Sequence, residues 1–471
     1  MDSKWQRLSL REAGISLIDC VHKTPEAKDN GYPYVAIPQM KDGRIDLSST
    51  RKISHDDFLA WTIKAKPRAN DVVLSRRCNP GESAYVKEGV EFALGQNLVL
   101  LRSDGNKVHK PYLRWLLNSP FWWAEVQKFM NVGAIFTSLK CADVLEFTLP
   151  IPPLNTQVKI SEILYSIDKK IELNNQINQT LEAMAQAIFK SWFVDFEPVK
   201  AKIAALEAGE DAEGVTRAAM SAISGKTDED LDQLQAEQLE NYTQLKTTAE
   251  LFPSAMQDSE FGEIPEGWKV EKLKNNSNQI IRGFTSKYVE KSNLINLNQK
   301  VNRGIYLDKS NFKYYPENTK VSEEKFAKKK DILINSLGQG TLGRVHLFWE
   351  DVHNIVIDQH ITVVRTNYVS LYPEYLHNYL SYKETQSRLE SLVTGTTGML
   401  MLNVSKIRDF SVLVPDADIQ REFSSVVSDF YSQKYKNTME NEVLSQLRDS
   451  LLPKLLSGEL SVDIAEFAEE K

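Results

Sequence analysis

The chain has 471 residues, of which 42% are hydrophobic and 26% are charged, and its formal net charge is −7. This length is too great for one ordinary hydrophobic core, so we expect at least two domains. No apolar run of about 18 residues is present and the first residues lack the apolar stretch of a signal peptide, so we expect a cytoplasmic protein without a membrane segment.

The net charge conceals basic and acidic blocks along the chain. Residues 1–150 carry 21 Lys and Arg against 17 Asp and Glu, a balance of +4, and residues 266–415 carry 21 against 15, or +6. Residues 197–265 carry 5 against 15, or −10, and residues 457–471 carry 1 against 5, or −4. A polyanion such as DNA responds to regional charge, so the two basic blocks are candidates for nucleic-acid contact.

The first predicted domain, residues 1–152, consists of short β-rich segments broken by Gly, Asn and Pro turns. The runs DVVLSR and NLVLLR predict two of its strands. Cys20, Cys78 and Cys141 are too far apart for a disulfide framework or a C-x-x-C metal site. We interpret them as buried structural thiols and predict no bound metal.

A long helix is predicted at residues 153–196. Residues 155–193 contain neither proline nor glycine, and as a helix they would span roughly 58 Å. The residues expected to face a partner recur in alternating steps of four and three, the spacing of a coiled-coil seam. The predicted seam of this helix includes Ile160, Ile167, Ile171, Asn174, Asn178, Leu181 and Ile188.

The acidic residues 197–265 have no counterpart later in the chain. Two of their segments, AKIAALEAGEDAEG and DEDLDQLQAEQLENY, have helical patterns. We interpret the stretch as a solvated connector, with a docking surface for a partner subunit as the alternative.

The second predicted domain, residues 266–416, contains the glycine-rich stretch SLGQGTLGR. Gly338, Gly340 and Gly343 have the G-x-G-x-x-G spacing of a dinucleotide-binding turn. Such a turn needs a following helix whose amide end faces the pyrophosphate, but the next residues, RVHLFWE, have a strand pattern. We therefore predict a tight turn between strands and no cofactor bound by this chain.

A second long helix is predicted at residues 417–457, followed by an acidic tail at 458–471. Its seam includes Phe430, Asn437, Asn441, Leu444 and Leu451. Both seams are apolar at their ends and polar in the middle, so each helix is the natural partner of the other. The seams alone fit a parallel or an antiparallel pair; a rigid pair carrying two like domains favours the antiparallel one.

The chain contains an internal sequence repeat, in which the second half resembles the first. Shifting it by 263 positions aligns GQNLVLLR with DQHITVVR, and EFTLPIPPLNTQ with DFSVLVPDADIQ. The predicted fold class is therefore α+β: two similar β-rich domains separated by two long helices paired as an antiparallel coiled coil, with a pseudo-two-fold repeat.

Cationic side chains in turns of the β-rich domains are the candidate DNA-binding residues, since phosphates and guanine edges attract Lys and Arg. Arg76, Arg77 and Arg344 lie in loops that the repeat makes equivalent. The full set is Lys41, Arg44, Arg76, Arg77, Arg282, Arg303, Lys313 and Arg344.

The order LPIPPLNTQVKISEIL, FKSWFVDFEPV, LFPSAMQDSEFGEIPEGW and LLPKLLSGEL resembles the DNA specificity subunit of type I restriction-modification systems. The resemblance implies two target recognition domains that each read one half of a bipartite site in double-stranded DNA. It also implies that the helices dock two modification subunits, which carry S-adenosylmethionine and methylate adenine N6. Restriction subunits, where the system has them, add ATP and Mg. This chain itself would be non-catalytic, and it has no methyltransferase or phosphate-loop motif.

Two other functions stay open on the residues alone. The glycine spacing suits a nucleotide-dependent enzyme, and the long helices suit a coiled-coil protein-interaction scaffold without DNA specificity. The repeat and the regional charges favour the DNA-reading function.

Overall fold

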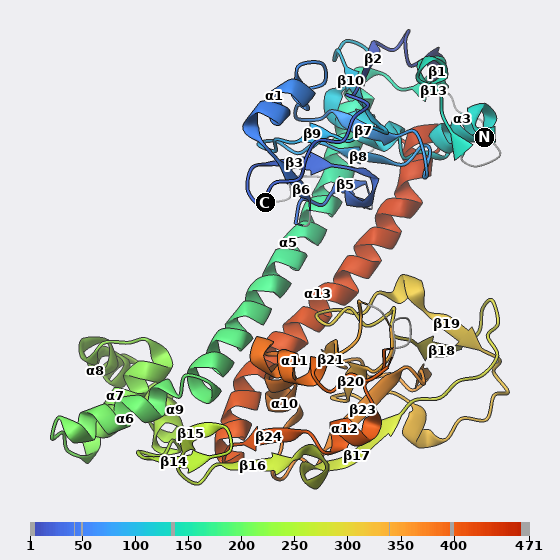
Figure 1. Cartoon of the computed structure of the whole chain (residues 1–471). Helices are drawn as coiled ribbons and strands as arrows, with labels where there is room; N and C mark the ends of the chain where they lie inside the picture. The colour runs from blue at the N-terminus through green and yellow to red at the C-terminus, as the bar shows by residue number, and fades with distance from the viewer. Residues whose placement is uncertain are drawn as a thin grey trace. The chain divides into compact units, whose positions relative to one another are not determined.

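The computed structural model describes residues 5–41, 43–48, 50–132, 137–338, 340–395 and 400–462. The chain divides into two compact units, the first formed by Met1–Leu173 with Glu440–Lys471 and the second by Asn174–Met439. Each unit contains a β-rich domain and part of two long helices, α5 (Leu154–Phe193) and α13 (Ala417–Ser457) (Figure 1). No described helix has the length and apolarity that crossing a bilayer requires.

The first unit contains a four-stranded antiparallel sheet, a three-stranded sheet with one parallel pair, and a two-stranded pair. Their orders are β2 (Ile15–Asp19), β10 (Leu98–Ser103), β7 (Val72–Ser75), β8 (Ser83–Tyr85); β6 (Arg51–Ile53), β3 (Tyr32–Val35), β9 (Ala93–Leu94); and β1 (Gln6–Ser9), β13 (Thr148–Ile151). Smaller elements are β4 (Met40–Lys41), β5 (Arg44–Ile45), β11 (Asn131–Val132), β12 (Thr137–Ser138), α1 (His55–Thr62), α2 (Leu113–Leu116), α3 (Pro120–Phe129) and α4 (Cys141–Val144).

The second unit repeats these sheets with the same strand order. They are β17 (Ser277–Arg282), β23 (Ile361–Thr366), β20 (Ile332–Asn335), β21 (Val345–Leu347); β19 (Lys313–Tyr315), β18 (Leu294–Leu297), β22 (Ile355–Ile357); and β16 (Lys269–Lys272), β24 (Ser411–Val414). Helices α10 (Pro373–Ser381), α11 (Lys383–Glu390) and α12 (Val404–Arg408) complete the domain. The predicted α+β fold and internal repeat are confirmed, including the strands predicted from DVVLSR and NLVLLR, which are β7 and β10.

A buried ion pair recurs in the two domains. Arg102 on β10 donates to the Asp71 carboxylate through Nε at 2.8 Å and Nη2 at 2.6 Å. Arg365 on β23 donates to Asp331 in the same way, with both distances 2.8 Å. Both carboxylates are almost fully buried, so each needs its bidentate partner. Arg102 and Arg365, which the repeat aligns, therefore stabilise the fold of their own domains.

A glutamine holds each long helix to its own domain. Gln157 donates to the carbonyl oxygens of Pro152 at 2.7 Å and Lys107 at 2.8 Å, and accepts from the backbone amide of His109. Gln420 makes the equivalent three bonds in the second unit, to Pro415, Ser370 and Tyr372. This aligned pair thus fixes the direction in which each helix leaves its sheet.

Helices α5 and α13 run antiparallel in each unit. In the first unit Arg448 Nη1 lies 3.0 Å from Asp168 Oδ1, and Lys170 Nζ lies 3.2 Å from Glu440 Oε2. In the second unit, Asn437 Nδ2 donates to Asn178 Oδ1 at 2.8 Å. Residue numbers therefore rise on one helix as they fall on the other, which confirms the antiparallel prediction and the polar contact in the middle of the seam.

Burial varies along the predicted seam. Ile160, Ile167, Ile171, Asn174 and Asn437 are buried, whereas Asn178, Leu181, Ile188, Phe430, Asn441, Leu444 and Leu451 are partly exposed. Lys434 on α13 also pairs with Glu182 on α5. The seam thus combines apolar ends with a hydrogen-bonded and ionic middle, which specifies register.

The acidic connector is helical, as its pattern predicts. It contains α6 (Glu197–Glu207), α7 (Ala212–Ser224), α8 (Asp228–Glu237) and α9 (Leu239–Glu250), then a hairpin of β14 (Met256–Ser259) and β15 (Gly262–Pro265). The helices share a small core that includes Ala219, Met220, Leu231 and Tyr242. Of the predicted acidic tail, residues 463–471 lie outside the described part of the chain.

Candidate nucleic-acid interface

The glycine-rich stretch is a turn between two antiparallel strands. It joins β20 to β21, which pair through Ile332–Leu347 and Ile334–Val345. Gly338, Gly340 and Gly343 have φ angles of 113°, 73° and 78°, a region that glycine enters without steric cost. No helix N-terminus follows them, so the predicted strand-to-strand turn is confirmed and the dinucleotide-binding geometry is missing here.

The repeat places a second turn of the same kind between β7 and β8. The Gly81 amide donates to the Ser75 carbonyl at 3.0 Å, and the Gly343 amide donates to the Asn335 carbonyl at 2.8 Å. Arg77 is exposed in the first turn. Arg344 closes the second, where its Nη2 donates to the Gly340 carbonyl at 2.9 Å. Arg77 is thus the more available of the two for a ligand.

Arg76 is less available than its neighbour. Its side chain is only 13% exposed, and its Nη2 lies 3.8 Å from Asp19 Oδ1. Its backbone amide and carbonyl bond to Asn97 and Leu139 on either side. We therefore assign Arg76 first to the packing of this loop.

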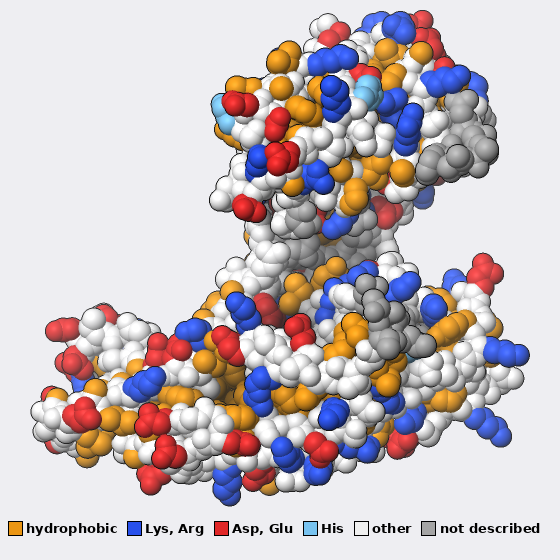
Figure 2. Space-filling model, viewed as in Figure 1, with side chains coloured by type: hydrophobic (Ala, Val, Ile, Leu, Met, Phe, Trp, Pro, Cys, Tyr) orange, Lys and Arg blue, Asp and Glu red, His pale blue; other side chains and the backbone are white. Residues whose placement is uncertain are grey.

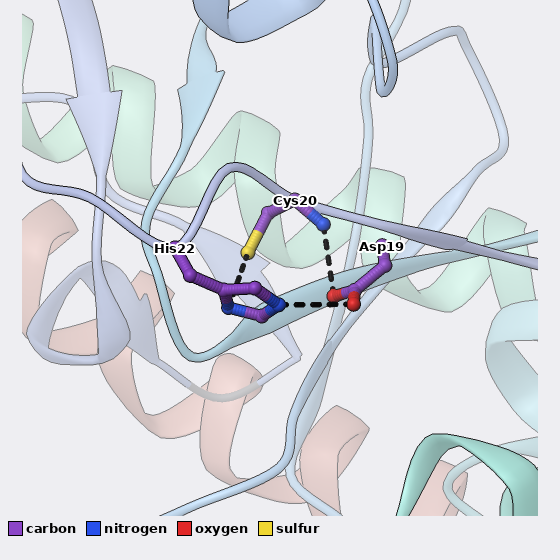
Figure 3. A group of neighbouring side chains, drawn as sticks. All are labelled: Asp19, Cys20 and His22. Atoms are coloured by element: carbon purple, nitrogen blue, oxygen red, sulfur yellow. Dashed lines mark hydrogen bonds and ion pairs between the residues drawn. The ribbon is translucent and has the colours of Figure 1, made fainter.

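Asp19, Cys20 and His22 gather beside Arg76, and their side chains approach one another closely (Figure 3). The two ring nitrogens of His22 face different partners: Nε2 lies 3.0 Å from Asp19 Oδ2, while Nδ1 lies 3.0 Å from the Gln96 carbonyl and 4.0 Å from Cys20 Sγ. Burial raises the pKa of the Cys20 thiol to about 11. A chain of hydrogen bonds with a protonated thiol describes this group better than one shared cation.

The interpretation of all three cysteines as buried is right only for Cys20. Cys20 is buried and Cys141 is partly exposed, but Cys78 is exposed. It lies in the β7–β8 turn, outside both strands, with φ 65°.

Lys41 and Arg303 occupy equivalent turns, and both are paired. Lys41 Nζ lies 2.8 Å from Asp46 Oδ2, and Arg303 Nη2 lies 3.0 Å from Asp308 Oδ2. Ser48 and Ser310 donate to the same two carboxylates. Each ion pair closes its turn. Because the pairs are exposed, Lys41 and Arg303 can still contact a phosphate.

The remaining candidates differ in availability. Arg282 donates to the carbonyl oxygens of Gln359 at 3.2 Å and Leu402 at 2.8 Å, and burial lowers its pKa. Arg44 is 29% exposed and faces Asp168 at 3.7 Å. Lys313 is exposed, with its Nζ 4.3 Å from the Tyr288 ring centre. The structure thus leaves Lys313 and Arg77 open and ties Arg282 and Arg44 to the fold.

Surface charge follows the segregation seen in the sequence. Figure 2 shows Lys and Arg spread over the face of the second β-rich domain, while Asp and Glu gather over the connector helices. The loops that carry the candidate cations therefore lie on the basic parts of the chain, where a phosphate backbone would be attracted.

Sequence reasoning missed two features of these domains. The first is Ile305, which is 56% exposed beside the 51% exposed Tyr306 at the tip of the turn that contains Arg303. The second is a cluster of arginines around Asp168, described below. Aligning Lys41 and Asp46 with Arg303 and Asp308 could have identified the turn, because both pairs are five residues apart.

Duplicated β-rich domains with cationic turns, joined to two antiparallel helices, are the architecture of a two-domain recognition protein. The family model of the type I restriction modification DNA specificity domain matches residues 18–183 and 261–446. The chain therefore belongs to the family of type I restriction-modification specificity subunits.

Two named relatives and one solved structure agree with this membership. The chain is 30% identical over 451 residues to the type I restriction enzyme HindI specificity subunit of Haemophilus influenzae, covering 92% of this chain and 95% of the relative. It is 25% identical over 425 residues to the MjaIX specificity subunit of Methanocaldococcus jannaschii, covering 88% and 82%. The S subunit from M. genitalium has a similar fold, with a TM-score of 0.50, 15% identity and 96% coverage of each chain.

The membership assigns DNA sequence recognition to this chain, as a non-catalytic subunit of a larger system.

Proposed function

We propose that the chain reads a bipartite DNA site, one half with each β-rich domain, and positions adenine-N6 methyltransferase subunits on it. One observation carries the proposal: the two domains share strand order and buried anchors, such as Arg102–Asp71 and Arg365–Asp331, yet differ in their turns. A common scaffold with different turns suits the reading of two different half-sites.

The paired helices suit the second part of the proposal. Exposed apolar side chains lie along them at helical spacing, including Val443 and Leu447 in the first unit, at 62% and 45% exposure. In the second unit Ile177, Met184 and Val426 are 37–44% exposed. Apolar side chains on the outside of a helix pair are suited to burial by a partner. We therefore propose that modification subunits dock on the helices.

Sequencing of methylated adenine in cells with and without this gene tests the proposal. We expect one bipartite N6-methyladenine motif, with an unspecified spacer between two short specified parts, to disappear when the gene is deleted. An identical methylation pattern in both strains would contradict it and favour a scaffold without DNA specificity.

Replacing Val443 and Leu447 together by aspartate tests the docking surface. Burying a carboxylate in an apolar interface is costly, so we expect recovery of the modification subunit with the tagged variant to fall at least about tenfold. Leu239→Asp on α9 is the control, because Leu239 is 63% exposed on the connector. Equal recovery with both variants would exclude this part of the helix pair.

A further inference from the structure

The turn of residues 302–308, called here the Asn302 turn, is firmly held at its base. Asn302 is fully buried; its Nδ2 donates to Asn335 Oδ1 at 3.0 Å and its Oδ1 accepts from the Gly304 amide at 2.8 Å. The Arg303 amide donates to the Tyr306 carbonyl at 3.1 Å. The Arg303–Asp308 pair closes the turn from outside.

A half-buried histidine fixes the peak of the turn. His346 Nδ1 donates to the Gly304 carbonyl at 2.6 Å, and burial lowers the pKa of its ring to about 4, so the imidazole is neutral near pH 7. Gly304 has φ 86°, the left-handed region that the turn requires. The backbone that carries Ile305 and Tyr306 is therefore set by the domain core.

The side chains at the tip are apolar and exposed. Ile305 is 56% and Tyr306 is 51% exposed, although the backbone on both sides is hydrogen-bonded. Exposing two adjacent large apolar groups on a rigid turn has a cost in solvent, and a partner that covers them removes it.

Two observations identify the partner as DNA. The turn adjoins the glycine-rich turn, since Asn302 bonds to Asn335 at the end of β20, and Gln299 bonds there too. The charge around the tip is also cationic: Asp308 is paired with Arg303 and Glu350 with Lys309, while Lys300, two residues before the turn, is exposed. An apolar tip framed by cations fits bases framed by phosphates.

The repeat supplies a third observation. In the first domain the hairpin of β4 and β5 is closed in the same way, with Lys41, Asp46 and Ser48 matching Arg303, Asp308 and Ser310. Its tip differs: Gly43 and Arg44 stand where Ile305 and Tyr306 stand. The closing residues are thus retained and the tip is changed: Arg44 faces Asp168 in the first domain, whereas Ile305 and Tyr306 are exposed in the second.

We propose that Ile305 and Tyr306 are specificity determinants of the second domain and make apolar contact with base edges or steps in its half-site. The inference rests on the proposed reading of a bipartite site. Apolar side chains recognise the thymine methyl group in the major groove and wedge between base steps in the minor groove. Lys41 and Arg303, in contrast, hold the turns that present the tips.

The test uses the full chain in cells that contain its modification subunits. The double variant Ile305→Ser/Tyr306→Ser is compared with Tyr368→Ser/Val369→Ser, since Tyr368 and Val369 are another exposed aromatic and β-branched pair in the same unit, at 46% and 74%. We expect the first variant to lose selectivity or methylation of the second half-site by about tenfold, with the first half-site unchanged. The control is expected to retain the wild-type motif.

A second variant, Ile305→Gly/Tyr306→Arg, transfers the tip of the first hairpin and is expected to change the bases preferred in the second half-site. Wild-type selectivity and methylation in both tip variants would overturn the inference. Loss of modification-subunit binding in both, with the control intact, would also overturn it and assign the turn to a subunit contact. A wild-type chain without a bipartite motif would instead refute the proposed function itself.

Discussion

Replacing Asp168 by alanine is expected to destabilise the first unit by about 3–5 kcal/mol, since it leaves buried charge uncompensated. The Asp168 side chain on α5 is 6% exposed and is surrounded by three guanidinium groups. Arg114 pairs with Oδ2, Arg448 on α13 lies 3.0 Å from Oδ1, and Arg44 lies 3.7 Å from Oδ2. One carboxylate thus joins both helices to the β-rich domain.

Of the three arginines, Arg114 is the least exposed, so it has the least access to water or another anion if Asp168 is removed. Its guanidinium carbon lies 3.9 Å from the ring centres of both Tyr85 and Trp115, and its side chain is 12% exposed. Burial lowers the pKa of Arg114 to about 10, which reflects the cost of charge at this position. Without Asp168, three like charges remain together in a poorly solvated site.

Thermal and urea unfolding of the purified complex measure this effect. Asp449→Ala is the control, because Asp449 also contacts Arg448, at 2.9 Å, but is 65% exposed. We expect this control to change stability by less than about 1 kcal/mol, as for other exposed ion pairs. Similar losses of unfolding free energy in both variants would show that the Asp168 cluster stabilises the unit no more than an exposed ion pair does.

The long helices and the strands could be predicted because their signals are local. The helices predicted at residues 153–196 and 417–457 coincide with α5 and α13 to within three residues at each end. The role of Asp168 could not be predicted in this way. It follows the seam residue Ile167, and the helix pattern predicts only that this position is polar. Its meaning comes from Arg114 and Arg44, which are distant in sequence.

The candidate DNA-binding residues show the same limit. A sequence identifies Arg282 as a cation in a basic block, but the carbonyl groups that hold it belong to Gln359 and Leu402, which only the tertiary fold brings near. Arg77 and Lys313, in contrast, are exposed on the surface, where Lys313 lies over the Tyr288 ring. Tertiary packing, rather than residue type, separates structural cations from free ones.

Lengthening both helices by one heptad is expected to change the spacer of the recognised site and leave both half-sites unchanged. Duplicating residues 171–177 in α5 and 438–444 in α13 keeps the seam in phase, because seven residues make close to two helical turns. The helices gain about 10.5 Å, which corresponds to roughly three base pairs of B-DNA. Because each added base pair also rotates one half-site relative to the other, we expect the accepted spacer to grow by about one to three base pairs.

Motif mapping by methylated-adenine sequencing measures the spacer directly. Duplication in α5 alone is the matched control: it moves Asn178 and Glu182 away from Asn437 and Lys434, which they contact in the wild type. This control should lose methylation altogether, because the register of the seam is broken. An unchanged spacer in the doubly lengthened chain would refute the helix pair as the ruler, since the two domains would then be spaced by something other than α5 and α13.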